Sequence, residues 1–253
     1  MHSPQFTAES SSNGIVERDF TVDGVPGVLW SPAAGADRAP LVLMGHGGGA
    51  HKKHRAMVGR AQLLVAGCGF HVAVLDAPGH GDRPRTAHDE RDIAALREAQ
   101  ATGAPEAPIV VPYNARLAEF AVPEYRATLD ALQELPEIGA DGPVGYVGIA
   151  MGTAIGVPLV AAEPRITAAV FGMMWADALC EAARRITVPI EFSMHWDSER
   201  VPRGTSLALF DAFGSKEKTL HAVAGEHVDP RLEADSATRF FARHLGRSVA
   251  STA

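Results

Sequence analysis

The segment 144–162 constrains the fold of this chain more than any other. An apolar run at 144–147 leads directly into the pentapeptide Gly-Ile-Ala-Met-Gly at 148–152, and a helical pattern follows over 151–162. Two glycines that flank the junction of a strand and a helix predict a tight, strained turn, because larger side chains would collide there. Such a turn presents its central residue at the tip, where a nucleophile is expected. That residue is Ala150, which offers no oxygen.

Strand-length apolar runs alternate with helical patterns through most of the 253 residues. This alternation predicts an α/β fold with a mostly parallel eight-stranded sheet and helices on both faces. The predicted strands are 18–22, 27–30, 40–45, 71–75, 144–148, 166–173, 189–194 and 218–223. The predicted helices are 54–66, 88–102, 124–135, 151–162, 176–185, 204–213 and 237–245. We interpret 1–253 as one domain with a polar tail at each end, 1–14 and 248–253.

One long connection, 83–122, does not fit the simple alternation. Connections of this length inside a compact domain tend to be functional covers or pocket walls. We therefore interpret 83–122 as a partial lid, with a plain surface excursion as the alternative. The stretch 175–189 holds only one short helical pattern, so a large separate cap domain is not expected.

Composition excludes several classes of function. The formal charge is −7, and no stretch concentrates Lys and Arg as a nucleic-acid-binding face would. No run approaches the roughly 20 apolar residues that span a bilayer, and residues 1–13 are polar and Ser-rich. We predict a cytoplasmic protein without nucleic-acid or membrane partners. Cys68 and Cys180 are expected to be free thiols, and no nucleotide or other cofactor is implied.

A glycine-rich loop provides the next catalytic feature. The run 41–45 predicts a buried strand, and His-Gly-Gly-Gly follows it at 46–49. Glycine lets the backbone approach a substrate and aim its N–H groups at a developing oxyanion. We assign one donor to Gly48, with Gly49 as a second candidate, and the other to Met151, which follows the nucleophile position. A plain strand-end turn is the alternative; a Walker loop is not, because neither Gly-Lys-Ser nor Gly-Lys-Thr occurs.

The base and its orienting acid are expected near the end of the chain. His227 follows the last predicted strand, where its ring can reach the carboxyl edge of the sheet. Asp197 follows the preceding strand, 30 residues before the histidine, where a buried carboxylate could accept the imidazole N–H. Glu199 and Asp177 are the alternative acids. The chain order of nucleophile position, acid and histidine selects His227 among eleven histidines.

The segment Asp-Ala-Pro-Gly-His-Gly-Asp at 76–82 resembles a metal site only superficially. No histidine pair at ligand spacing accompanies it, so no metal site is predicted. Gly79 and Gly81 allow a sharp turn after a strand, and Asp76 or Asp82 can hydrogen-bond the turn backbone.

Together these segments resemble bacterial α/β-hydrolases of the dienelactone-hydrolase-like esterase group, over about residues 15–247. The resemblance rests on the glycine loop, the 76–82 turn, the pentapeptide, Trp-Asp-Ser-Glu-Arg-Val-Pro at 196–202, the run 215–220 and Gly-Glu-His at 225–227. It implies an ester or lactone hydrolase with serine at position 150, acid at Asp197 and base at His227. Two departures are Ala150 itself and Glu226, where the family often has glycine.

The intact surroundings of Ala150 suggest a serine hydrolase whose nucleophile has been replaced by alanine. Thr153 is no substitute, because it lies one turn into the helix and points away from the tip. The alternatives are a natural non-catalytic, ligand-binding homologue and an acyltransferase or cyclase. His46, Trp175 and Trp196 are weaker candidates for contact with a small-molecule ester or lactone substrate. The sequence identifies neither that substrate nor the oligomeric state.

Overall fold

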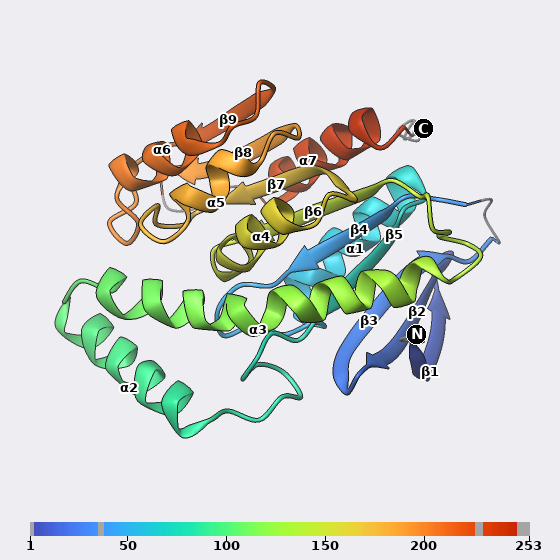
Figure 1. Cartoon of the computed structure of the whole chain (residues 1–253), viewed down its shortest axis with the longest axis horizontal. Helices are drawn as coiled ribbons and strands as arrows, with labels where there is room; N and C mark the ends of the chain where they lie inside the picture. The colour runs from blue at the N-terminus through green and yellow to red at the C-terminus, as the bar shows by residue number, and fades with distance from the viewer. Residues whose placement is uncertain (1–2, 35–37, 226–229, 247–253) are drawn as a thin grey trace.

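The computed structural model describes residues 3–34, 38–225 and 230–246, and these form a nine-stranded sheet with helices on both faces. The strand order is β1-β2-β3-β5-β4-β6-β7-β8-β9 (Figure 1). Strands β4 to β9 run parallel to one another, whereas the pairs β1–β2, β2–β3 and β3–β5 are antiparallel. The strands are β1 (Gln5–Ser12), β2 (Ile15–Val22), β3 (Val25–Pro32), β4 (Leu41–Gly45), β5 (His71–Leu75), β6 (Val144–Ile149), β7 (Ile166–Gly172), β8 (Ile190–His195) and β9 (Lys218–Val223).

Strand β1 is one more than the sequence predicted, and it occupies most of the expected polar tail 1–14. Every one of its residues is exposed, so it lacks the apolar alternation that identifies a half-buried strand. The sequence feature that indicates β1 is the Asn13-Gly14 pair, whose positive φ angles of 51° and 75° form the turn into β2. Asp23 and Gly24 form the same kind of turn between β2 and β3, with φ of 51° and 79°.

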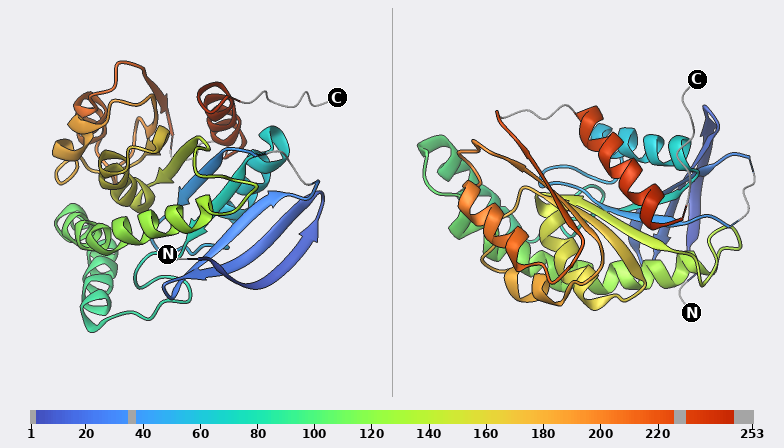
Figure 2. Two further views of the ribbon diagram at one scale, coloured as in Figure 1. Left: turned by 45° about the vertical axis from the view of Figure 1, so that its right-hand side comes forward. Right: turned by 90° about the horizontal axis from the view of Figure 1, so that it is seen from above.

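Two groups of helices cover the sheet. The right-hand view of Figure 2 shows α1 and α7 together on one face and α3, α4 and α5 on the other. The helices are α1 (Arg55–Cys68), α2 (Ala87–Thr102), α3 (Ala107–Gln133), α4 (Met151–Ala162), α5 (Cys180–Arg185), α6 (Arg203–Ala212) and α7 (Pro230–His244). Because the central strands are covered on both sides, their residues are apolar in both directions: Leu41 and Leu43 pack toward α3, and Val42 and Met44 toward α1.

Helix α3 begins at residue 107, whereas the sequence predicted a helix only from 124. Pro112 and Pro123 lie inside it, and prolines normally end or kink a helix because they lack an N–H. The two carbonyl groups that lose their partners belong to Pro108 and Glu119, both exposed residues, so water can hydrogen-bond them. The prolines are therefore tolerated, and the helix continues through them.

The segment 83–122 consists of α2 and the first half of α3, which extend beyond the carboxyl ends of the parallel strands (Figure 1). A capping box formed by Thr86 and Asp89 starts α2, and Gly103 in the left-handed conformation ends it. Between β7 and β8 the chain forms only the short helix α5. No helix within the described ranges is long and apolar enough to cross a membrane.

Helix α4 packs so closely on β6 that one glycine has no room for a side chain. A Cβ on Gly156 would overlap the ring of Tyr146, lying 2.6 Å from its Cζ. We expect Gly156→Ala to lower the free energy of unfolding by about 1–3 kcal/mol, because the buried phenol must move. Urea denaturation measures the change. Gly59→Ala in α1 is the matched control: that Cβ meets open space, and the variant should be neutral or up to about 1 kcal/mol more stable. Equal stability of the two variants would contradict the packing argument.

Candidate active site

The tight turn expected at 148–152 is present between β6 and α4. Ala150 has φ 55° and ψ −118°, a conformation that residues other than glycine rarely adopt. Its N–H donates to the carbonyl of Gly172 on β7 at 3.0 Å, and its carbonyl accepts the first bonds of α4 from Thr153 and Ala154. The strained residue is thus held from both sides and its side chain stands at the tip of the turn.

Glycines are required around this turn because two backbones meet there. A Cβ on Gly148 would lie 2.5 Å from the carbonyl of Gly152, and one on Gly152 would overlap the carbonyl of Gly45 at the end of β4. No other residue fits these positions without displacing main chain. The turn is therefore packed directly against the strand that leads into the glycine-rich loop.

Three buried hydroxyl groups hold the turn and the end of β4 beside it. Tyr146 donates to the carbonyl of Gly152 at 2.7 Å, and Tyr125 donates to the carbonyl of Met44 at 2.8 Å. Burial raises the pKa of both phenols above the ordinary value, so both remain protonated donors. The Thr153 hydroxyl lies 2.7 Å from the carbonyl of Gly148 and accepts from the N–H of Gly172 at 2.9 Å. Thr153 is fully buried and is directed into this framework, away from the tip.

His46 positions the glycine-rich loop. The residue is 1% exposed, its Nδ1 lies 3.0 Å from the carbonyl of Gly47, and its Nε2 accepts from the N–H of Ala77 at 3.0 Å. Burial lowers the pKa of His46 to about 4, so the ring is neutral and can accept that bond. His46 does not line the cavity at the carboxyl ends of the parallel strands. Instead of the expected substrate contact, it joins the loop after β4 to the loop after β5.

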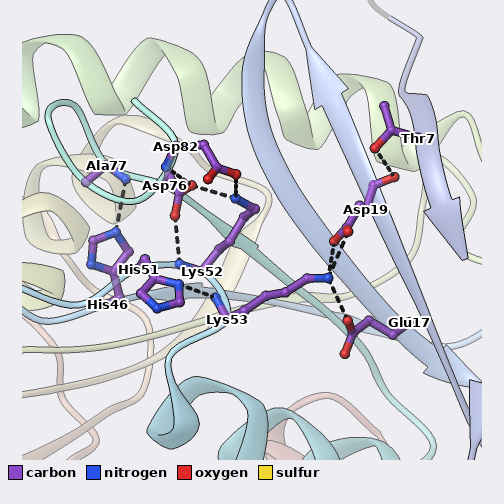
Figure 3. A network of polar contacts seen from close by, with 10 residues as sticks. All are labelled: Thr7, Glu17, Asp19, His46, His51, Lys52, Lys53, Asp76, Ala77 and Asp82. Carbon is purple, nitrogen blue, oxygen red and sulfur yellow. Dashed lines mark hydrogen bonds and ion pairs between the residues drawn. The ribbon is translucent and has the colours of Figure 1, made fainter. Parts of the chain in front are cut away.

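A buried ion-pair network fixes the same two loops (Figure 3). Asp76 is completely buried; it accepts the Nζ and backbone N–H of Lys52, each at 2.7 Å, and the N–H of Asp82 at 3.0 Å. Burial raises the pKa of the Asp76 carboxyl, but the bonds from Lys52 and Asp82 outweigh it, and the pKa lies below its ordinary value. A Cβ on Gly81 would overlap this carboxylate. The carboxylate thus serves the turn, and no metal-binding group of side chains occurs among the described residues.

The neighbouring lysine faces the opposite way. Lys53 pairs with Glu17 at 2.8 Å and Asp19 at 2.7 Å, both on β2 (Figure 3). The loop between β4 and α1 is therefore tied to the antiparallel part of the sheet as well as to the loop after β5. Both lysines have protein partners, so neither is a free cation for a substrate.

A cavity of about 800 Å³ lies at the carboxyl ends of the parallel strands, beneath α2 and α3. Its walls are the glycine loop at 47–49, the turn at 150–151, the segment 173–175 after β7, the segment 198–201 after β8, and side chains of α2 and α3. Ala150, Met151 and the proposed donors Gly48 and Gly49 all border this one space. The segment 83–122 thus supplies a wall of the cavity.

Strained backbone gathers at the cavity. Among the described residues other than glycine, four have positive φ; Asn13 and Asp23 serve the hairpins, and Ala150 and Met173 line the cavity. Met173, at the end of β7, has φ 52°, and its N–H is held by the carbonyl of Ser193 at 3.1 Å. Strain of this kind is commonly found where side chains and backbone donors must be aimed at a ligand.

The proposed acid, Asp197, contacts the described chain just before the segment that holds the proposed base. Asp197 accepts a long 3.4 Å bond from the N–H of Gly225, two residues before His227, which is outside the described residues. Asp197 is exposed, whereas the sequence predicted a buried carboxylate; it lies in the open turn after β8. Glu199 is also exposed and lines the cavity, while Asp177 is exposed and does not line it.

The two tryptophans have different positions. Trp175 is buried and lines the cavity. Trp196 is 41% exposed and does not line the cavity. The guanidinium carbon of Arg203 lies 4.3 Å from the centroid of its ring. Only Trp175 is therefore placed for the substrate contact that the sequence predicted for both.

Sequence reasoning did not single out His80, which also lines the cavity. It is 6% exposed and its Nδ1 lies 2.9 Å from the carbonyl of Pro78, which fixes the proton on that nitrogen. Burial lowers the pKa of His80. Its place in the turn after β5, at the carboxyl edge of the sheet, was the available signal.

Known structures identify the family. The chain is 30% identical to a cold-adapted esterase from an Arctic intertidal metagenomic library, in a PEG-bound complex, over 95% of this chain and 99% of that one, with a TM-score of 0.74. The chain belongs to the same family of α/β-hydrolase-fold esterases. No protein-family profile matches the sequence, and no curated protein does.

More distant structures share the fold. A dienelactone hydrolase from Anabaena variabilis is 18% identical over 96% of this chain and 100% of its own, with a TM-score of 0.60. An acetyl xylan esterase from Paenibacillus sp. R4 is 13% identical over 96% and 88%, with a TM-score of 0.67. These likenesses concern the architecture alone.

The buried carboxylate of Asp76 makes stability depend on pH. We expect Asp76→Asn to destabilise the protein by about 3 kcal/mol at pH 7, because it removes one partner of a buried ion pair. Because the pKa of Asp76 is lower in the folded protein, the ionised carboxylate stabilises the fold at pH values above the unfolded-state pKa near 4. This contribution is lost as the pH falls through the lower folded-state pKa. The difference from the parent chain should therefore shrink below about pH 4.

Urea denaturation at pH 7 and at low pH tests this expectation. Asp82→Asn is the matched control, because the Asp82 side chain is 75% exposed and its loss should cost under about 1 kcal/mol. A deficit for Asp76→Asn that stays constant down to low pH would contradict the ionised, paired state of the carboxylate.

Proposed function

We propose that this protein, when it carries serine at position 150, hydrolyses carboxylic esters or lactones. The present chain, with alanine at that position, is then the inactive form. The observation that carries the proposal is that the strained turn at Ala150 and the glycine loop at 47–49 border one cavity. The family relationship to a cold-adapted esterase supports the same class of reaction.

The proposed mechanism uses backbone donors and three side chains. A serine Oγ at position 150 attacks the ester carbonyl carbon while His227 takes its proton. Asp197 orients the imidazole and stabilises the imidazolium that forms. The N–H groups of Gly48 and Met151, with Gly49 as an alternative, stabilise the oxyanion. His227 then protonates the leaving alcohol, and water releases the acid in the second half of the reaction.

Positioning in this mechanism is supplied by groups that need no rearrangement. Met151 is the first residue of α4, so its N–H belongs to the unpaired donors of a helix N-terminus. The glycine loop is held by His46 and by the Lys52–Asp76 pair, as described above. Donors fixed before the substrate arrives stabilise developing charge more effectively than donors that must reorient.

Restoring the nucleophile tests the proposal. We expect Ala150→Ser to hydrolyse p-nitrophenyl esters or lactones on the order of 10⁴–10⁶ times faster than the parent chain, because removal of a nucleophile costs about that much. A fluorophosphonate should label the introduced serine once, as measured by mass spectrometry. Ala150→Gly is the control: it relieves the positive φ without adding a hydroxyl and should stay inactive and unlabelled.

Other outcomes identify the alternatives. A folded Ala150→Ser variant that is inert and unlabelled would overturn the hydrolase proposal and leave a non-catalytic, ligand-binding homologue. Transfer of the acyl group to an added alcohol or amine in preference to water would identify an acyltransferase or cyclase.

The acid is tested in the restored enzyme. We expect Asp197→Asn, combined with Ala150→Ser, to lower kcat by about 10³–10⁴-fold, because the histidine loses the carboxylate that orients it. Glu199→Gln in the same background is the matched control, since it neutralises a second exposed carboxylate on the same loop and should leave kcat unchanged. The reverse order of effects would assign the acid to Glu199.

A further inference from the structure

A second cavity lies beside the first, between α3, α4 and the segment 174–179. Its volume is about 420 Å³ and its lining is mostly apolar. Three residues border both cavities: Asn114 on α3, and Met174 and Trp175 after β7. Asn114 is the only one of the three whose side chain both donates and accepts strong hydrogen bonds, and it lies at the junction between the two spaces.

Asn114 is a buried residue whose amide has no hydrogen-bond partner among the described residues. It is 4% exposed, and neither its oxygen nor its nitrogen makes a hydrogen bond to any residue that the structure describes. Its neighbours on the buried face of α3 include Val110, Leu117 and Ala118. A buried amide that makes no hydrogen bond destabilises a protein, whereas an apolar residue of the same size would pack there without that cost.

Two further residues that line the larger cavity each carry a polar atom that has no partner in the described parts of the chain. The Tyr113 hydroxyl, one residue from Asn114, is buried and makes no hydrogen bond. His80 uses its Nδ1 for the carbonyl of Pro78, which leaves Nε2 as a free acceptor. The set therefore combines an amide that donates and accepts, a hydroxyl that does both, and a ring nitrogen that accepts.

We propose that Asn114, with Tyr113 and His80, binds a neutral hydroxyl group on the substrate, so that the proposed esterase acts on hydroxylated esters. This inference rests on the proposed function, from which it takes the ester. The polar groups without partners are the evidence for the hydroxyl. A hydroxyl is the small neutral group that both donates to His80 Nε2 and accepts from the amide. A carboxylate could not donate to that nitrogen.

An anionic substituent is the competing ligand that a test must separate. Arg97 on α2 lines the same cavity, and it is an exposed cation. The other lining arginines are engaged by the protein: Arg85 bonds Gly79 and pairs with Glu90, and Arg200 pairs with Glu106 at 2.7 Å. Three neutral groups without described partners, on Asn114, Tyr113 and His80, stand against this one cation, and all three residues are more buried than Arg97. The lining therefore favours a neutral ligand group.

The present chain allows the test without turnover, because it lacks the nucleophile. The probes are methyl 3-phenylpropanoate and its derivatives with a hydroxyl, hydroxymethyl or carboxylate group at the meta or para ring position. Isothermal titration calorimetry gives their Kd values. We expect the tightest hydroxylated probe to bind about 3- to 10-fold more tightly than the unsubstituted ester, the increment of a neutral hydrogen bond, and more tightly than either carboxylate.

Substitution of Asn114 assigns the preference to this residue. Asn114→Leu keeps the side-chain size and should remove the advantage of the hydroxylated probe, while binding the unsubstituted ester as well or more tightly. Thr128→Val is the matched control: Thr128 lies on the same helix, is fully buried with an unpartnered hydroxyl, and borders neither cavity. It should leave all Kd values unchanged.

The outcomes distinguish this inference from the proposed function. Equal binding of hydroxylated and unsubstituted esters by the unaltered chain overturns the hydroxyl subsite, whether or not Asn114→Leu folds. Tightest binding of a carboxylate also overturns it and favours Arg97. Hydrolysis of methyl 3-phenylpropanoate by Ala150→Ser tests the esterase separately, so an inactive variant that still prefers hydroxylated probes would refute only the proposed function.

Discussion

The site depends on the close approach of two backbones. Gly152, at the start of α4, contacts the end of β4 at Gly45 with no space for a Cβ on the helix side. This contact sets the distance between the turn at Ala150 and the loop that begins after β4. Because both contacting groups are main chain, the spacing cannot relax through a change of side-chain rotamer. The contact therefore holds the turn at Ala150 and the glycine loop as one rigid unit. The Tyr146 hydroxyl bonds the same carbonyl of Gly152 and reinforces the contact.

Around that contact the protein concentrates buried polar interactions that stabilise loops rather than the core. The neutral ring of His46 and the carboxylate of Asp76 each connect the loop after β4 with the loop after β5. Ion pairs of this kind contribute little net stability over apolar packing, because burial of the charges offsets their attraction. Their contribution is geometric. They hold the backbone of these two loops in place at the cavity. In the proposed mechanism, N–H groups fixed in this way stabilise the charge that develops in the transition state.

The parts of the fold that apolar patterning determines could be predicted from sequence, and the polar parts could not. Strands β5 and β9 and helix α4 have the predicted bounds, because each is an apolar or amphipathic run between clear turn signals. Strand β1 was missed because it is exposed throughout, and the first half of α3 because its prolines suggested a break. The turn at Ala150 was evident from its glycines. Asn114 and His46 were not, since whether a buried polar residue is satisfied depends on contacts distant in sequence.

In the proposed function, one missing hydroxyl oxygen separates binding from chemistry in this chain. The turn at Ala150 keeps a positive φ that an alanine occupies only with strain, so the geometry required for a presented side chain persists although that side chain carries no hydroxyl. A serine Oγ would add a group at the tip without requiring any change in the backbone bonds to Gly172 or Thr153. Loss of a nucleophile removes the reaction while the donors and the cavity that bind the substrate remain. Under the proposed function, the same fixed backbone that would accelerate hydrolysis would retain an unreacted ester. The cavity's polar groups that lack partners among the described residues would gain hydrogen bonds from such a ligand.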